Sequence, residues 1–387
     1  MAPKVLVLEP FYSGSHKYLC DVLQELENDD GFSVRVAGWE GGSKWHWRML
    51  VSAAHFAGTL DKADVAAAQI VMFSAMMNVA ELLGFLPELA SKRKLLYIHE
   101  NQLEYPRSNQ EAAASKGQST FNLVWNQVAS CMCVDQILFN SAYNRDSFFE
   151  KLGPFVNRIP TGVRPGGFSI EALQAKSKVL YLPITAPLAI MERDKGSSEP
   201  PLHLVWAHRW EYDKGPEAFL SALRGVAEAA PQDTRIKLSV LGSTASSASP
   251  AFEEALAQVS TEVFDIIHWG GLESREAYLE VLRGADVALS TSIHEFFGLS
   301  MLEAATCGCM PICPKRLSYP ELFPKECLYS TERQLVKKIL SFAKRPSVPR
   351  CLMSDAVWRT RLEKFQWTRV GSARDEWKTV LIGSKAE

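Results

Sequence analysis

The sequence lacks long hydrophobic runs, and this excludes a membrane-spanning protein. The longest apolar region, Val65 to Ala80, is interrupted by polar side chains and bounded by Asp64 and Glu81, so it cannot cross the hydrocarbon core of a bilayer. The first residues place Lys4 in a strand-like run and do not have the layout of a signal peptide. We therefore expect a soluble protein of the cytoplasm, and the nucleus stays open as a second compartment.

Cysteine pairs and strong net charge are also missing. The eight cysteines lie scattered in apolar segments, which indicates free thiols in a reducing compartment. Cys307, Cys309 and Cys313 form C-x-C-x3-C, but no second pair lies nearby, whereas zinc sites usually use C-x2-C pairs. No D-x-D motif occurs in a predicted loop, so we expect no metal. A formal net charge of −2 excludes a uniformly basic nucleic-acid binder and leaves a local basic surface open.

A glycine-rich dinucleotide fingerprint is absent as well. The chain opens with a predicted strand, Lys4 to Glu9, followed by a turn at Gly14 and a helix, but it contains no G-x-G-x-x-G. Gly14 could let the backbone approach a phosphate or sugar closely, and a tight turn without a ligand is the alternative. Strands and helices then alternate along the chain, which predicts an α/β fold.

The length of 387 residues suits two domains. Prolines and serines gather between Pro183 and Pro201, which predicts a linker. Phe365, Trp367 and Trp377 occur at helical intervals near the end of the chain, as expected of a terminal helix that packs back on the first domain. We therefore expect an N-terminal domain at 1–185, a linker at 186–200, a C-terminal domain at 201–350 and a helical segment at 351–387.

The stretch from Ala285 to Pro314 is predicted to form strand, loop, helix and strand. Gly298 opens the helix and Gly308 stands where a helix-ending glycine belongs. Since such a helix begins at the carboxyl end of a strand, its first N–H groups suit a diphosphate. Glu295 and Glu303 flank this helix start and could bind sugar and ribose hydroxyl groups. An ordinary buried strand–helix unit is the alternative reading.

Two cations follow the first strand of the second half. Arg209 and Lys214 lie five positions apart in a predicted loop, where they could stabilise the charge that develops on a departing diphosphate. Surface charge is the alternative for either cation alone. Together with Glu295 and Glu303, they predict an enzyme that uses a nucleotide-sugar.

The first half carries two clusters that suit an acceptor. Lys44-Trp45-His46-Trp47-Arg48 is a predicted loop in which aromatic rings stand between cations, a pattern that suits stacking on a base and contact with phosphate. A packing cluster with charged ends is the alternative. The strand from Lys94 to Ile98 ends in His99-Glu100-Asn101-Gln102, at the edge where α/β sheets bind ligands.

These motifs resemble known families. Glu295 to Glu303 resembles the E-x7-E signature of retaining GT-B glycosyltransferases. The chain as a whole resembles the tRNA-queuosine mannosyltransferases, once known as glycosyltransferase-like domain-containing proteins. The segments that carry this second resemblance are FYSGSHK (11–17), KWHWR (44–48), YIHENQLEYP (97–106), FNS (139–141), HRWEYDK (208–214), HEFFGLSMLEA (294–304) and CGCMPICPKRLSYPELFP (307–324).

The resemblance implies two Rossmann-like domains facing a central cleft. It implies transfer of mannose from GDP-mannose to queuosine in the anticodon of tRNA-Asp, with retention. We expect no metal cofactor, because Arg209, Lys214 and the Phe297-Gly298 amides could replace a metal at the diphosphate. The implied catalytic residues are His99, Arg209, Lys214 and Glu295. The implied donor site comprises Gly14, Arg209, Lys214, Trp269, Gly270, Glu295, Phe297, Gly298, Leu299 and Glu303. The implied acceptor site comprises His16, Lys44, Trp45, His46, Trp47, Arg48, Glu100, Asn101, Gln102 and Asn140.

Three other functions stay open. The first is the same donor site with a different nucleotide-sugar, or with a glycan or small-molecule acceptor. The second is a sugar-nucleotide epimerase, which should need more acids and bases around the sugar. The third is an RNA-binding protein with a decayed donor site, although intact Arg209, Lys214, Glu295 and Glu303 speak against decay. We expect no membrane partner and no obligate protein partner.

Overall fold

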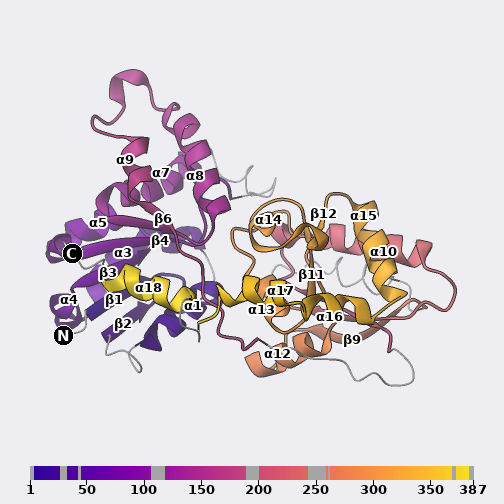
Figure 1. The fold of residues 1–387 in the computed structure, drawn as a ribbon. Coiled ribbons are helices and arrows are strands. Elements are labelled where there is room, and N and C mark those ends of the chain that lie inside the picture. Colours follow the sequence, from indigo (N-terminus) through magenta and orange to yellow (C-terminus); the bar gives the residue numbers. More distant parts are fainter. Residues whose placement is uncertain are drawn as a thin grey trace. The chain divides into compact units, whose positions relative to one another are not determined.

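The computed structural model describes residues 4–26, 33–41, 45–105, 118–188, 200–242, 259, 262–367 and 372–382. The chain divides into two compact units, which are Met1–Pro183 with Ala373–Glu387, and Ile184–Ser372. In each unit helices pack around a parallel sheet (Figure 1). Most of the predicted linker at 186–200 lies outside the described residues.

The first unit contains a six-stranded parallel sheet with the order β2-β1-β3-β4-β5-β6. The central strands β3 and β4 are almost wholly buried, because helices cover both faces of such a sheet. The strand order reverses between β1 and β3, and ligands bind at such a reversal in open α/β sheets. The strands are β1 (Lys4–Glu9), β2 (Ser33–Gly38), β3 (Ile70–Ser74), β4 (Arg93–Ile98), β5 (Gln136–Phe139) and β6 (Ser177–Val179).

Polar side chains begin the helices of the first unit. Asn78, Ser141 and Ser169 each accept a hydrogen bond from an N–H group of the first turn. Helix α5 starts at Val79 and ends at Phe85, before a 3-10 turn that starts with Pro87. The helical elements are α1 (Gly14–Gln24), α3 (Trp45–Thr59), α4 (Lys62–Ala67), α5 (Val79–Phe85), η1 (Pro87–Ser91), α7 (Gln118–Cys133), α8 (Ala142–Val156), η2 (Thr161–Val163), α9 (Ile170–Ala175) and α18 (Ala373–Ile382).

The second unit contains another six-stranded parallel sheet, in the order β12-β11-β10-β7-β8-β9. Its order reverses between β7 and β10, which is the doubly wound arrangement of dinucleotide-binding folds. Its core is built around Trp206 and Phe219, whose rings stack at 4.9 Å. The strands are β7 (Leu202–Ala207), β8 (Ile236–Leu241), β9 (Phe264–Gly270), β10 (Val287–Leu289), β11 (Met310–Pro314) and β12 (Leu328–Tyr329).

The helices of the second unit also begin at capping residues. Thr331 accepts a hydrogen bond from the N–H of Gln334, as the capping-box spacing predicts. No helix in the described ranges of the chain is long and apolar enough to cross a membrane. The helical elements are η3 (Tyr212–Lys214), α10 (Pro216–Ala229), α12 (Arg275–Gly284), α13 (Leu299–Thr306), α14 (Tyr319–Leu322), η4 (Lys325–Cys327), α15 (Glu332–Ala343), α16 (Ser347–Met353) and α17 (Ala356–Glu363).

The terminal helix α18 belongs to the first unit. The indole N–H of Trp377 donates to the carbonyl of Tyr181 at 2.9 Å, and its ring lies 5.2 Å from that of Tyr97. The prediction of helical periodicity at Phe365 and Trp367 was wrong, because both lie between α17 and α18. There the backbone pairs with Ile184 instead: Ile184 N–H donates to Phe365, and Trp367 N–H donates to Ile184.

Candidate active site

An ion cluster lies where the strand order of the second sheet reverses. The ammonium of Lys214, after β7, lies 3.0 Å from a carboxylate oxygen of Asp213 and 3.2 Å from one of Glu295, after β10. Sequence analysis predicted Lys214 and Glu295, and the structure brings them together. It missed Asp213. The available signal was the position of Asp213 beside Lys214, in a loop that follows a strand.

The three charges of this cluster stabilise one another against burial. Burial disfavours the charged form of Lys214, but the carboxylates of Glu295 and Asp213 outweigh it and raise the pKa of Lys214. Burial likewise opposes ionisation of Glu295, and Lys214 and then His208 outweigh it, so the pKa of Glu295 is lowered. Two carboxylates and one ammonium are therefore all ionised at neutral pH.

Close backbone approach holds the two loops together. Gly215 has a φ of +64°, and a Cβ there would lie 2.3 Å from the carbonyl oxygen of Thr291, so only glycine fits. The N–H groups of Ile293 and His294 both donate to the carbonyl of Asp213. The loops after β7 and β10 thus form one rigid edge that fixes the ion cluster.

The start of α13 adds an anion-binding feature to this edge. Gly298 precedes the helix with a φ of +95°, and no side chain caps the first turn. Leu299 begins the helix, and Phe297 N–H lies 3.4 Å from a carboxylate oxygen of Glu295. Such N–H groups and the helix dipole suit a phosphate group. The predicted glycine at the end of this helix, Gly308, has a φ of +92° as expected.

Glu303 is buried in α13 and paired with α12. Arg275 donates to its carboxylate at 2.5 Å, and Tyr278 hydrogen-bonds to it as well. Burial raises the pKa of Glu303, and these two partners only partly oppose it. Sequence analysis missed Arg275 and Tyr278, because only the packing of α12 against α13 shows them to be neighbours of Glu303.

Arg209, Trp269 and Gly270 lie at the same edge of the second sheet. The Arg209 side chain is 55% exposed and forms an ion pair with Glu211 at 3.2 Å, so it stands outside the Lys214 pairing. Burial raises the pKa of Asp213, but the charge of Lys214 opposes burial, and the net result is a lowered pKa. The charge of Arg209 adds to this lowering. Trp269 and Gly270 end β9, and Trp269 is 42% exposed with its ring edge-on to Trp210 at 4.8 Å.

His208 is a buried neighbour of the cluster that sequence analysis did not single out. It hydrogen-bonds to the backbone of Leu289 on β10, while its Nε2 atom is buried without a hydrogen-bond partner in the described part of the chain. Burial and then the charge of Lys214 lower the pKa of His208 to about 4, although Glu295 and Asp213 oppose this. His208 is therefore neutral at pH 7.

The corresponding edge of the first sheet carries a histidine pair. His16, in the first turn of α1, stacks on His99 after β4, with ring centroids 3.9 Å apart and planes at 27°. Nδ1 of His16 lies 3.0 Å from a carboxylate oxygen of Glu9, the last residue of β1. Burial, followed by the charge of His16, holds the pKa of His99 well below its usual value. Sequence analysis predicted His16 and His99 but not Glu9.

The amides near His99 mainly bind the protein itself. Asn101 is fully buried and donates to Asn144 and Ser147, which argues against direct contact with an acceptor. The N–H of Gln102 donates to a side chain of α7, and Asn140 donates to the carbonyl of His99. Glu100 is half-buried, and its carbonyl accepts from α7.

The KWHWR segment begins helix α3, so the predicted loop is wrong from Trp45 onward. Trp45 stacks on His46 at 3.5 Å, and Trp47 is 67% exposed. Arg48 donates to the backbone carbonyls of Pro10, Trp39 and Glu40, which argues against the predicted phosphate contact. Lys44 lies outside the described residues. Gly14, with a φ of +52°, is the first residue of α1.

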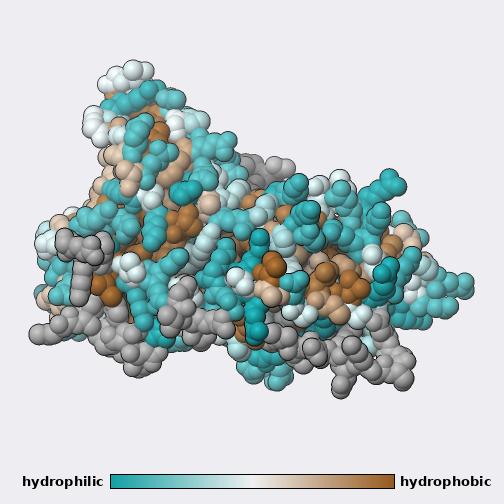
Figure 2. All heavy atoms as spheres, in the orientation of Figure 1, coloured by the Kyte–Doolittle hydropathy of each residue, from teal (hydrophilic) through white to brown (hydrophobic). Residues whose placement is uncertain are grey.

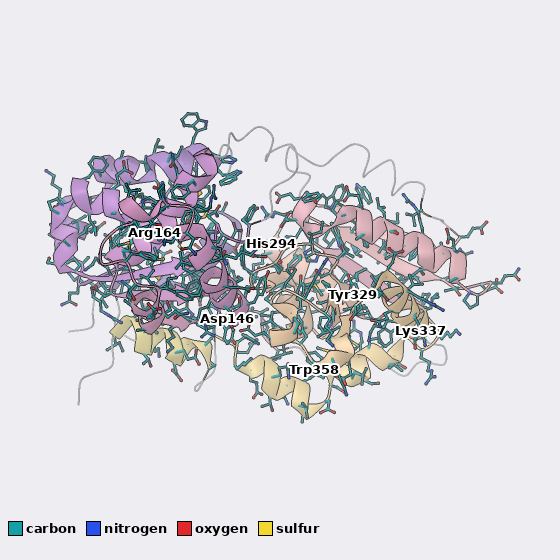
Figure 3. All side chains as sticks on the ribbon, turned by 90° about the horizontal axis from the view of Figure 1, so that it is seen from above. Asp146, Arg164, His294, Tyr329, Lys337 and Trp358 are labelled. Carbon is teal, nitrogen blue, oxygen red and sulfur yellow. The ribbon has the colours of Figure 1, made fainter. Side chains whose placement is uncertain are left out.

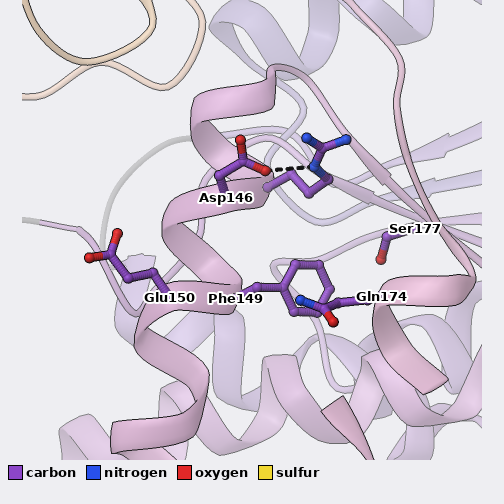
Figure 4. A pocket seen from close by; sticks show the side chains of 6 residues that line it. Asp146, Phe149, Glu150, Gln174 and Ser177 are labelled. Carbon is purple, nitrogen blue, oxygen red and sulfur yellow. Dashed lines mark hydrogen bonds and ion pairs between the residues drawn. The ribbon is translucent and has the colours of Figure 1, made fainter. Parts of the chain in front are cut away.

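A hollow of about 540 Å³ lies between α8 and α9 in the first unit (Figure 4). Its lining contains the Arg145–Asp146 ion pair at 2.8 Å, together with Glu150 and Phe149. The hollow contains none of the predicted site residues.

Comparisons with known proteins agree with this arrangement. Residues 4–184 match the family described as tRNA-queuosine alpha-mannosyltransferase N-terminal, and residues 190–346 match the family Glycosyl transferases group 1. A protein of Drosophila melanogaster named tRNA-queuosine alpha-mannosyltransferase is 37% identical over 361 residues, which is 89% of this chain and 88% of that protein.

Solved structures show the same fold. Sucrose-phosphate synthase from Thermosynechococcus elongatus aligns with a TM-score of 0.65 and 16% identity over 98% of both chains. HepE from Anabaena, in complex with UDP and glucose, aligns with a TM-score of 0.61 and 14% identity over 98% of this chain and 99% of that one. The predicted α/β fold of the GT-B type is thereby confirmed. Together with the extended match to the Drosophila protein, this shows that the chain belongs to the tRNA-queuosine alpha-mannosyltransferase family.

Proposed function

We propose that this protein transfers mannose from GDP-mannose to queuosine in the anticodon of tRNA-Asp, in the cytoplasm. The name of the Drosophila relative supports the acceptor and the sugar. The observation that carries the donor side is the Asp213–Lys214–Glu295 cluster beside the uncapped start of α13. Cations next to free helix N–H groups are the features that hold a diphosphate and stabilise its departure.

In this proposal the second unit binds the donor. The N–H groups at the start of α13 and the cations Lys214 and Arg209 hold the diphosphate. Glu295 accepts hydrogen bonds from hydroxyl groups of the sugar, and Glu303 accepts them from the ribose. The exposed face of Trp269 stacks on the base. This arrangement needs no metal ion, because the two cations and the N–H groups neutralise the diphosphate.

The reaction that suits these residues is substitution on one face of the sugar. The bond between C1 and the diphosphate oxygen breaks, and a bond from C1 to the acceptor oxygen forms on the same face, so configuration is retained. The proton of the acceptor hydroxyl goes to the departing diphosphate oxygen. Lys214 and Arg209 stabilise the negative charge that builds up there.

The first unit binds the acceptor in this proposal. His99 is neutral at pH 7, because burial and His16 hold its pKa low, so it can donate one hydrogen bond and accept another. It would position the reacting hydroxyl group or the sugar rather than act as a base. Trp45, His46 and Trp47 offer aromatic surface for the splayed anticodon base.

The test is transfer with defined substrates. Purified protein is incubated with GDP-mannose, GDP-fucose or UDP-glucose and queuosine-containing tRNA-Asp, and the nucleosides are analysed by mass spectrometry. We expect queuosine to gain one hexose with GDP-mannose alone. The same tRNA without queuosine and the Glu295→Gln protein are the controls. Absence of transfer with every donor would overturn the proposal, and transfer from another donor would correct the sugar.

A further inference from the structure

Part of the first unit projects beyond its sheet. We define the α8–α9 tip as residues 157–168, which connect α8 to α9 and include the 3-10 turn η2. Figure 1 shows this connection reaching away from the strands, and Figure 2 shows teal and white, hydrophilic to neutral, at its end. Val163 within it is 69% exposed. The tip is therefore a solvent-facing feature and adds little to the core.

The helix that leads into the tip begins on the side of the first sheet where His99 lies. Helix α8 begins there, because Asn144 in its first turn donates to the carbonyl of Ile98 at the end of β4. The middle of α7 lies there too, since Gln127 donates to the carbonyl of Glu100. Phe121 precedes Gln127 by six residues, which places it about 9 Å farther along α7.

The end of α8 packs against this outer part of α7. The rings of Phe155 and Phe121 stack at 4.7 Å. Since α7 runs from there back to the opposite edge of the sheet, where Asp135 accepts from Lys94 N–H, Phe121 stands beyond the carboxyl edge. The tip follows Phe155 directly and therefore begins at the edge that carries the histidine pair, while its other end leads through α9 to β6.

The tip is positively charged in a protein whose formal net charge is −2. Residues 151–170 contain Lys151, Arg158 and Arg164 and no Asp or Glu. Lys151 forms an ion pair with Glu104. Arg158 and Arg164 are both exposed, and neither has a carboxylate partner in the ranges that the structure describes. Two uncompensated cations therefore remain on the tip.

Both arginines are held in place. The Arg158 guanidinium lies over the ring of Phe121 at 5.5 Å, which fixes it without using its N–H groups. Arg164, labelled in Figure 3, donates from Nε to the carbonyl of Ile159 at 3.0 Å and from one terminal nitrogen to that of Asn157 at 3.4 Å. Its other terminal nitrogen stays available to a ligand. Positioned guanidinium groups are well suited to phosphate oxygens.

We propose that the α8–α9 tip binds the phosphodiester backbone of the tRNA, with Arg158 and Arg164 as its phosphate contacts. This inference rests on the proposed function, because it takes the acceptor to be a tRNA. A base held near His99 leaves the rest of the anticodon arm to extend over the same edge of the sheet. Contacts to backbone phosphates fix the position of an RNA without reading its sequence.

The test compares Arg158→Gln/Arg164→Gln with wild type. The matched control is Arg333→Gln/Lys337→Gln, which removes two exposed cations from α15 in the second unit (Lys337 is labelled in Figure 3). Affinity is measured for a tRNA-Asp transcript over a series of salt concentrations, and melting curves establish that each variant is folded. The tip variant should lose roughly tenfold in affinity at low salt, and its slope of log affinity against log salt should decrease by about 1 to 2.

Unchanged affinity and slope in the tip variant, or an equal loss in the α15 control, would overturn the proposal. A larger loss for another anionic polymer, such as an acidic peptide, would also overturn it in favour of a protein partner. The transcript contains no queuosine, so the binding result does not depend on mannosyl transfer. Failure of the proposed function would give a different result. The wild-type protein would bind the transcript but would transfer no sugar to queuosine-containing tRNA.

Discussion

The two sheets of this protein share one architecture and use it for different chemistry. Each has six parallel strands whose order reverses once, and in each the polar residues gather at the carboxyl edge. The second sheet presents ionised groups there, with Lys214 between Asp213 and Glu295. The first presents His16 and His99, with the carboxylate of Glu9 beside them.

This difference follows from which residues end the strands. An edge of paired ions can accept an anionic diphosphate, because its cations are already fixed in place. An edge of stacked histidines with the Glu9 carboxylate beside them offers hydrogen-bond donors and acceptors, which suits hydroxyl groups and bases. One fold thus supplies a charged site and a largely neutral site, and the strand-following loops decide which is which.

Removing the central cation should break the charged edge most severely. We expect Lys214→Gln to lower kcat/KM by about 10²–10³-fold, because it removes a group that stabilises the departing diphosphate. It should also lower the free energy of unfolding by about 3–5 kcal/mol, since two buried carboxylates lose their partner. Initial rates and chemical denaturation measure the two effects. The exposed Lys315→Gln is the control, and a fully active Lys214→Gln protein would contradict the assignment.

Sequence reasoning found the parts of this edge that follow local rules. A strand, a glycine and a helix start predicted the place of Glu295 and Gly298 without knowledge of the fold. It could not show that Lys214 pairs with Glu295, or that Arg275 pairs with Glu303, because these contacts join loops or helices that are distant in sequence. Pairing across elements depends on packing, which no local pattern records.

The first edge shows the same limit. The sequence predicted His99 at a strand end, and the family resemblance implied His16, but only the structure shows that their rings stack. It assigned Arg48 to phosphate because of its aromatic neighbours, whereas the fold uses that guanidinium to bind backbone carbonyls. An aromatic and basic pattern does not distinguish a ligand site from a structural clamp.

The buried histidine of the charged edge should make stability depend on pH. The pKa of His208 is about 4 in the folded protein, because of burial and Lys214, and about 6.5 in the unfolded chain. The unfolded state therefore binds more protons between these values, and stability should fall as pH decreases from 6.5 to 4, by at most about 3 kcal/mol.

Denaturation at several pH values measures this effect of His208. His208→Asn, which keeps a donor for the carbonyl of Leu289, should show a shallower decline in stability than wild type over the same pH range. The exposed His46→Asn serves as the control and should follow wild type. An unchanged slope in His208→Asn would show that other groups dominate acid denaturation.

The donor carboxylate gives a smaller and more specific effect. Glu303→Gln should weaken binding of GDP-mannose by about 1.5–3 kcal/mol, because a charged hydrogen bond to the ribose is lost. Calorimetry measures the affinity. Arg275→Gln is the matched variant, since it breaks the same ion pair but keeps the carboxylate, and it should lose less affinity. Donor affinity unchanged in Glu303→Gln would remove Glu303 from the donor site.

On the neutral edge, the exposed indole of Trp47 should affect the acceptor alone. Loss of one aromatic ring that stacks on a base costs about 1–3 kcal/mol of RNA affinity, so Trp47→Ala should bind queuosine-containing tRNA more weakly and GDP-mannose normally. Phe85→Ala is the control, because Phe85 is also exposed, at 50%, but ends α5, which leads away from this edge. Loss of donor affinity with intact tRNA affinity would move Trp47 to the donor side.

The smallest expected effect is that of metal removal, which we predict to leave activity unchanged. Glu9, His16 and His99 are the group in the described part of the chain whose ligand atoms, within 4.8 Å of one another, could hold a metal ion. Imidazole binds metals through a lone pair in the ring plane, and the two rings stack with planes only 27° apart, so their lone pairs converge poorly on one ion. The carboxylate of Glu9 is also engaged, with Phe11 N–H at 2.8 Å and with His16.

Initial rates before and after treatment with EDTA test this prediction. Activity lost in EDTA and restored by magnesium or manganese would place a metal at the diphosphate, whereas restoration by zinc alone, together with a lower metal content in His16→Gln, would place it at the histidine pair.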